Sequence, residues 1–273
     1  MLKFRFRASR PVKLAGIFLL LLLLLLLTTT MLGCVTLGSA GKEERYAHPQ
    51  AAEILAAEGM AAFDRGRYRK ALKIFQEVKE RYPFSSVGPL AALKAADANF
   101  QLRRYQEAYT LYQEFENNHP TNEAIPYVLF QMGMSHYRRI DSVDRDPAHA
   151  INAIAVFSRL NRAFPDSPYA AEAQARILAA RDFLARHEMH IALYFVRTKE
   201  YDQATGRLHY LLDTYPESDT APAAEELLAA IESGNPPGRR WHEWLPDLSL
   251  GNWRGFFDAF SPVPGGGSEP SDF

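Results

Sequence analysis

The feature that most constrains the fold is a sequence pattern that occurs four times, each time ending in proline. The four segments are 68–83, 105–120, 150–165 and 201–216. In each, an alanine lies twelve residues before the proline and a large apolar residue lies eight before it: Ala71, Ala108, Ala153 and Ala204, then Phe75, Tyr112, Phe157 and Leu208. A four-residue offset places two side chains on one helical face, and proline ends a helix because it lacks an amide donor. The pattern predicts four related helices.

A second helical stretch precedes each of the first three segments. These stretches share a small residue at Gly59, Ala96 and Gly133, spaced 37 residues apart, and an aromatic residue follows four positions later at Phe63, Phe100 and Tyr137. The pattern resembles tetratricopeptide repeats, which are antiparallel helix pairs with small residues at their contact. It predicts an all-α tetratricopeptide-repeat solenoid of about five helix pairs, with the first helices along a concave face. The segment 168–200 is long enough for two helices, which we expect there.

The N-terminus predicts export and lipidation. Five cations and no acid occur in residues 1–13, an apolar stretch follows from Leu14 to Leu32, and Cys34 is the only cysteine. This order is typical of a secretory signal. The run Met31-Leu32-Gly33-Cys34 resembles a bacterial lipobox, which implies cleavage before Cys34 and a covalent diacylglyceryl group and acyl chain on its sulfur and amino group. The alternative is an inert Cys34 at the end of an uncleaved inner-membrane anchor, since the apolar length also suits a membrane span.

The predicted organisation has four parts. Residues 1–33 form the signal, 34–48 a lipidated linker, 49–232 the repeat domain and 233–273 a partly disordered tail rich in proline, glycine and aromatic residues. Removing the five cations of the signal from a formal net charge of −1 leaves −6. This charge argues against nucleic acid as a partner, because phosphate binding needs clustered positive charge.

Three stretches carry a more specific resemblance. Residues 81–100, 141–176 (which contains the run Asp-Arg-Asp) and 184–205 resemble the BamD family of outer-membrane assembly lipoproteins, also called ComL-type. The resemblance implies a scaffold of the β-barrel assembly machinery, lipid-anchored on the periplasmic face of the outer membrane. Its implied partners are a BamA-like barrel subunit, other assembly subunits and unfolded outer-membrane proteins. The alternatives are another repeat lipoprotein, either a secretin pilotin or a cell-envelope division coordinator.

The predicted peptide groove lies on the first helix of each pair. Its candidate residues follow from the positions of the small residues: Met60, Phe63, Asp97, Phe100, Met134 and Tyr137. Methionine and aromatic side chains give adaptable apolar contact with varied peptides. The alternative for each aromatic residue is packing between repeats.

No catalytic or metal site is predicted. The run His-Glu-Met-His at 187–190 lacks the spacing of a zinc helix, and we expect a helix junction there with Glu188 near a helix N-terminus. We expect neither enzyme activity nor a cofactor beyond the lipid on Cys34. The tail contains aromatic candidates for partner docking, with capping of the last repeat as the alternative: Trp241, Trp244, Trp253, Phe256 and Phe257.

Overall fold

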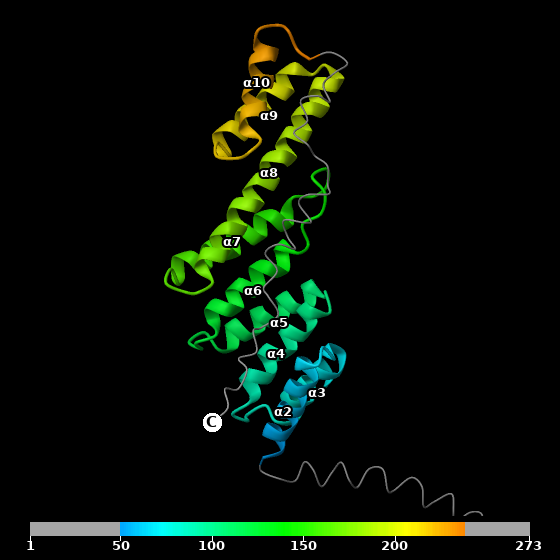
Figure 1. The fold of residues 1–273 in the computed structure, drawn as a ribbon, viewed down its shortest axis with the longest axis vertical. Coiled ribbons are helices and arrows are strands. Elements are labelled where there is room, and N and C mark those ends of the chain that lie inside the picture. The colour runs from blue at the N-terminus through cyan, green and yellow to red at the C-terminus, as the bar shows by residue number, and fades with distance from the viewer. Residues whose placement is uncertain (1–49, 238–273) are drawn as a thin grey trace, which may run out of the picture. The chain divides into compact units, whose positions relative to one another are not determined.

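The computed structural model describes residues 50–237, which form nine α-helices and contain no strand (Figure 1). The all-α class with tetratricopeptide-type helix pairs is confirmed within this range. The helices are α2 (Ala51–Asp64), α3 (Tyr68–Arg81), α4 (Gly88–Gln101), α5 (Tyr105–Asn118), α6 (Ile125–Tyr137), α7 (Ala148–Ala163), α8 (Ala170–Thr198), α9 (Tyr201–Thr214) and α10 (Ala221–Glu232).

The described chain forms two compact units that divide after Ala91, inside α4. The first unit contains the pair α2 and α3, and the second contains α5 to α10 with most of α4. Among the helices of residues 50–237, none is both long enough and apolar enough to cross a bilayer.

Each unit contains a pair whose helices meet at a glycine. In the first unit, a Cβ added to Gly59 of α2 would lie 2.6 Å from Cε1 of Phe75 in α3. In the second unit, a Cβ added to Gly133 of α6 would lie under 3.0 Å from three ring atoms of Phe157 in α7. Both phenylalanine rings are fully buried. The small residue of the sequence pattern is therefore the contact site for the aromatic residue of the following helix.

The turns inside three pairs use one left-handed residue. Gly66 has φ 69°, Arg103 has φ 60° and Lys199 has φ 63°. After each, the next amide donates back across the helix end, as in the bond from Arg67 N to Ala62 O at 2.9 Å. This arrangement satisfies carbonyls that the last helical turn leaves without partners.

The expectation of two helices within 168–200 is wrong. One continuous helix, α8, covers 29 residues from Ala170 to Thr198. Its sequence contains no glycine or proline, so nothing interrupts the backbone hydrogen bonds before the left-handed Lys199. The described residues consequently form four pairs and the single helix α10.

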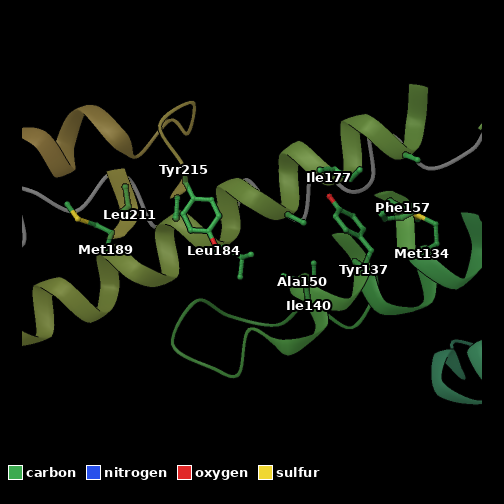
Figure 2. Packing of buried hydrophobic residues seen from close by; sticks show 14 of the residues in the cluster. Met134, Tyr137, Ile140, Ala150, Phe157, Ile177, Leu184, Met189, Leu211 and Tyr215 are labelled. Atoms are coloured by element: carbon green, nitrogen blue, oxygen red, sulfur yellow. The ribbon is translucent and has the colours of Figure 1, made fainter. Parts of the chain in front are cut away.

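The helix α8 packs mainly on two other helices, one along its first half and one along its second half. It contacts α7 and α9, and more weakly α6 (Figure 1). Figure 2 shows Ile177 of α8 with Tyr137 and Phe157, and Leu184 and Met189 with residues of the α9 segment. Glu188 therefore lies inside a long helix and not near an N-terminus, and its Oε2 accepts from Arg207 Nη1 of α9 at 3.1 Å.

Candidate peptide-binding surface

The groove candidates of the first unit are partly exposed. Met60 and Phe63 of α2 are both half-buried. The ring of Phe63 meets that of Tyr68 edge to face, with 5.1 Å between centroids. One side of these residues remains accessible, so both stay candidates for peptide contact.

Asp97 is a buried structural residue, contrary to its place in the predicted groove. It is 3% exposed. Its Oδ1 accepts from the hydroxyls of Tyr112 in α5 at 2.7 Å and Tyr127 in α6 at 2.9 Å, and its Oδ2 accepts from Lys94 Nζ at 2.9 Å. Burial and the Asp97 carboxylate raise the pKa of both phenols. The carboxylate joins three helices because buried polar groups need partners.

Met134 and Tyr137 are also buried, so the groove prediction is wrong for them in this conformation. Their exposed fractions are 3% and 1%. Tyr137 lies edge to face with Phe157, and the guanidinium of Arg176 in α8 lies 5.2 Å from its ring centroid. Figure 2 shows both residues among the packed core. Packing between repeats, the alternative for the aromatic residues, is what the structure shows for Tyr137.

Phe100 keeps partial exposure near the end of α4. Its ring lies 5.2 Å from that of Tyr105, again edge to face. The contact between Phe63 and Tyr68 has the same form. In both pairs, a phenylalanine near the end of the first helix meets the tyrosine that begins the second.

Two histidines face each other between α6 and α7. The rings of His136 and His149 are 5.9 Å apart, and His136 also lies 4.6 Å from the ring of Tyr109. Both Nδ1 atoms are buried without a hydrogen-bond partner. Burial, with His149 and Arg139 nearby, lowers the pKa of His136 to about 4, and burial also lowers the pKa of His149.

Sequence reasoning missed three exposed apolar residues of the first unit. Phe84, in the turn after α3, is fully exposed, and Ile54 of α2 and Leu90 of α4 are 52% and 41% exposed. Ser86 Oγ donates to Glu53 Oε1 at 3.2 Å, which brings the turn against the first turn of α2. The available signal was an aromatic residue placed directly after the helix-ending proline, where it has no helical face to join.

A cluster of half-buried aromatic residues in the second unit was also missed. Tyr127 and Phe130 of α6 lie 5.7 Å and 5.4 Å from the ring of Tyr169, which precedes α8, and Phe130 stacks on it. Each of the three is only partly buried. The three-residue spacing of Tyr127 and Phe130 indicates one helical face, but it does not show which part of that face remains exposed to solvent.

Residues 50–235 match the family model YfiO, described as an outer membrane lipoprotein. The chain belongs to the YfiO family.

Relatives of this YfiO-family chain are named "Outer membrane protein assembly factor BamD". The protein of Vibrio cholerae is 27% identical over 183 residues, covering 63% of this chain and 76% of the relative. That of Neisseria meningitidis serogroup B is 27% identical and covers 73% and 77%. That of Caulobacter vibrioides is 25% identical over 253 residues and covers 87% and 82%.

One solved structure similar to this YfiO-family chain is a thermophilic TPR protein of Thermus thermophilus. It is 17% identical, covers 67% of this chain and 99% of that chain, and has a TM-score of 0.37.

The connection with the run Asp-Arg-Asp packs against α8 in this YfiO-family chain. His187 Nδ1 donates to the carbonyl of Val143 at 2.5 Å, and Arg145 pairs with Asp141. Two of the stretches that carried the family resemblance, 141–176 and 184–205, therefore contact each other at this bond.

Several predicted residues of the YfiO-family chain lie outside residues 50–237. They are Cys34 and the tail aromatics Trp241, Trp244, Trp253, Phe256 and Phe257. Inside that range, no group of three or more histidine, cysteine or acidic side chains could hold a metal ion.

Proposed function

We propose that this chain is a non-catalytic assembly factor for outer membrane proteins, lipid-anchored on the periplasmic face of the outer membrane. The family match over residues 50–235 carries this proposal, supported by relatives that bear the assembly-factor name. The physical role is that of a scaffold, because paired helices offer extended surfaces for other polypeptides.

The proposed anchor is a diacylglyceryl group with an acyl chain on Cys34. Two or more acyl chains hold a protein stably on a bilayer, whereas one alone holds it weakly. Mass spectrometry of the mature N-terminus tests the anchor: the expected product begins at an acylated Cys34, and an intact residue 1 would contradict it.

The proposed ligand of the first unit is an unfolded outer membrane protein. The supporting observation is the fully exposed Phe84, with Ile54 and Leu90 also exposed on the same unit. Met60 and Phe63 add half-buried apolar surface. Exposed apolar side chains that gather on one part of a protein often mark an interaction site.

The second unit offers further partly exposed aromatic residues for the same ligand. Phe100 and the cluster of Tyr127, Phe130 and Tyr169 are only partly buried. The C-terminal repeats and the tail aromatics are the proposed contacts for a BamA-like barrel subunit and other assembly subunits.

Site-specific photocrosslinking tests the precursor ligand. A crosslinker at Phe84 should capture an unfolded barrel protein during its assembly, and a crosslinker at Leu178 of α8 serves as the control. A second crosslinker at Ile54, which is 52% exposed, matches Leu178 at 48%, so position and not accessibility separates this pair. Equal capture from Leu178 and Phe84 would contradict a specific surface.

Affinity purification from gently solubilised outer membrane tests the complex. The expected co-purified protein is a large β-barrel subunit with periplasmic repeats. Recovery of a secretin in its place would contradict the assembly role.

A further inference from the structure

The turn between α2 and α3 carries an unusual concentration of positive charge. Between residues 65 and 73 there are five cations and no acid: Arg65, Arg67, Arg69, Lys70 and Lys73. All five are exposed. We call this set the basic turn; it lies on the first unit, between the blue helices of Figure 1.

Internal ion pairs account for only one of these charges. Lys70 pairs with Glu58 at 2.9 Å, and both side chains remain about half exposed. Within residues 50–237 the other four cations form no ion pair, whereas Arg159, Arg181 and Arg207 of the second unit each pair with a glutamate. The basic turn therefore keeps most of its charge for an external partner.

The local backbone does not neutralise this charge. The first turn of α3 contains no acid, and Arg67 occupies its N-cap position. A helix N-terminus is itself electropositive, so cations there repel the helix dipole and each other. Nothing in the packing requires them, since the buried face of α3 consists of Ala71, Leu72, Ile74, Phe75 and Val78.

The proposed anchor keeps the basic turn close to a membrane. Fifteen residues separate Cys34 from Gln50, and an extended chain of that length reaches at most about 50 Å. The helix α2 adds about 20 Å between Ala51 and the turn. Linker and helix together span at most about 70 Å, so the basic turn reaches the lipid headgroups whenever the linker follows the membrane surface or folds back towards it.

From this charge and this tether we propose that the basic turn binds the anionic headgroups of the phospholipids in which the chain is anchored. The inference rests on the proposed lipid anchor. Clustered lysine and arginine residues next to an anchor attract anionic lipid, with a strength that falls as salt is added. Contact of this kind would fix the orientation of the first unit at the membrane, with the half-buried Phe63, whose ring meets Tyr68 at this turn, nearest to the lipid surface.

The charge distribution along the sequence favours the basic turn over the last two helices for contact with anionic lipid. The mature chain is acidic, and residues 200–232 contain eight acids against the single arginine Arg207. An anionic surface would attract the basic turn and repel α9 and α10. One end of the described sequence therefore suits the membrane better than the other.

Fluorescence quenching in reconstituted vesicles tests the contact. The full chain carries a Gln76→Cys label on the exposed face of α3 and is inserted through its own lipid on Cys34, which leaves the new thiol as the only free one. Quencher groups are attached to lipid headgroups. The two vesicle types are zwitterionic phosphatidylcholine alone and phosphatidylcholine mixed with anionic phosphatidylglycerol.

We expect quenching that depends on the anionic lipid and weakens in high salt. In the variant Arg65→Gln/Arg67→Gln/Arg69→Gln/Lys73→Gln, the bound-to-free ratio of the turn should fall about fivefold for each cation removed. The control Arg103→Gln/Arg104→Gln/Arg162→Gln/Lys199→Gln removes four exposed cations from the second unit and should leave quenching unchanged. The double variant Arg65→Gln/Arg67→Gln changes only the turn and keeps the test valid if the quadruple variant unfolds.

The possible failures are distinguishable. Equal quenching in the two vesicle types, or no effect of either turn variant, overturns the lipid contact while the anchor stands. A chain that floats only with anionic vesicles supports the basic turn and contradicts the anchor of the proposed function.

Discussion

The first and third helix pairs have an apolar contact where the second has a polar one. In the pairs α2/α3 and α6/α7 a helical glycine faces a buried phenylalanine ring, Gly59 with Phe75 and Gly133 with Phe157. The second pair has Ala96 and Tyr112 at the same positions of the sequence pattern. There the tyrosine hydroxyl donates to Asp97 at 2.7 Å.

The residue after the small one explains this difference. It is Met60 in the first pair, Asp97 in the second and Met134 in the third. A carboxylate at that position gives a buried phenol its acceptor, and a methionine suits a phenylalanine that needs none. All three pairs thus place a small residue at the position that faces an aromatic ring. The residue after the small one differs according to whether that ring carries a hydroxyl.

The largest expected effect comes from adding a side chain to the glycine that faces the phenylalanine ring. Gly133→Ala places a Cβ under 3.0 Å from three atoms of the fully buried Phe157 ring, so we expect a loss of about 3 kcal/mol in unfolding free energy. Gly59→Ala should cost somewhat less, because only one ring atom of Phe75 is closer than 3.0 Å. Urea denaturation measures both.

Gly206→Ala is the matched control for these two variants. Gly206 lies inside α9, and a Cβ added there would meet no atom within 4 Å, so alanine should stabilise the helix by up to about 1 kcal/mol. A loss of stability at Gly206 as large as at Gly133 would show that ring contact is not the cause.

Exchanging the two kinds of ring tests the polar difference. Tyr112→Phe removes a donor from Asp97 and Phe157→Tyr buries a hydroxyl beside Met134; each should cost about 2 kcal/mol. Thermal unfolding of the single variants measures the cost. The double variant Phe157→Tyr/Met134→Asp should recover part of it, and a further loss would contradict the proposed match between the two positions.

The pairs should also differ in their response to pH. Burial lowers the pKa of His136 to about 4, below its unfolded value of about 6.5, so the unfolded chain takes up the proton first. Stability should therefore fall as the pH drops from about 6.5 towards 4, by about 1–2 kcal/mol after allowance for partial exposure. Residues 50–91 contain no histidine, so hydrogen exchange in α2 and α3 should lack this dependence.

His136→Phe isolates the origin of the pH effect. It keeps a ring beside Tyr109 and should flatten the pH profile, whereas His190→Gln on the exposed side of α8 should not. An unchanged slope in His136→Phe would assign the effect to other groups.

The smallest expected effect concerns the turns inside the first two pairs. Gly66 and Arg103 occupy the same left-handed conformation, with φ of 69° and 60°. Arginine is strained there, so Arg103→Gly should stabilise the chain by about 0.5–1 kcal/mol, as measured by thermal unfolding. Gly66→Arg should have the opposite sign, and a gain from Gly66→Arg would refute the strain argument.

The periodic part of the fold was predictable from the sequence. The residue pattern before each proline predicted α3, α5, α7 and α9, because alanine and large apolar residues repeat with helical spacing. The long helix α8 was not predicted, since a repeat pattern suggests another turn and only continuous backbone bonding shows that none forms.

The candidate surface was less predictable, because sequence gives a helical face but not what covers it. Asp97 was placed on the groove face by its position next to Ala96, and only the two phenols that converge on it account for its burial. Phe84 was given no role from the sequence, and its exposure follows from its position in a turn. The burial of Asp97 depends on long-range packing, which the spacing of residues along one helix does not encode.

The unbroken α8 sets a strict rule for how this chain can vary in length. Adding or deleting one residue in a helix rotates all that follows by about 100° and shifts it by 1.5 Å. Since α8 packs on α7 with one half and on α9 with the other, a change of this kind near Ala185 would turn one of its two apolar stripes towards water. The turn after α8 is equally restricted, because Lys199 is left-handed and the amide of Glu200 donates to the carbonyl of Phe195. The length of α8 therefore fixes the spacing between its contacts with α7 and with α9.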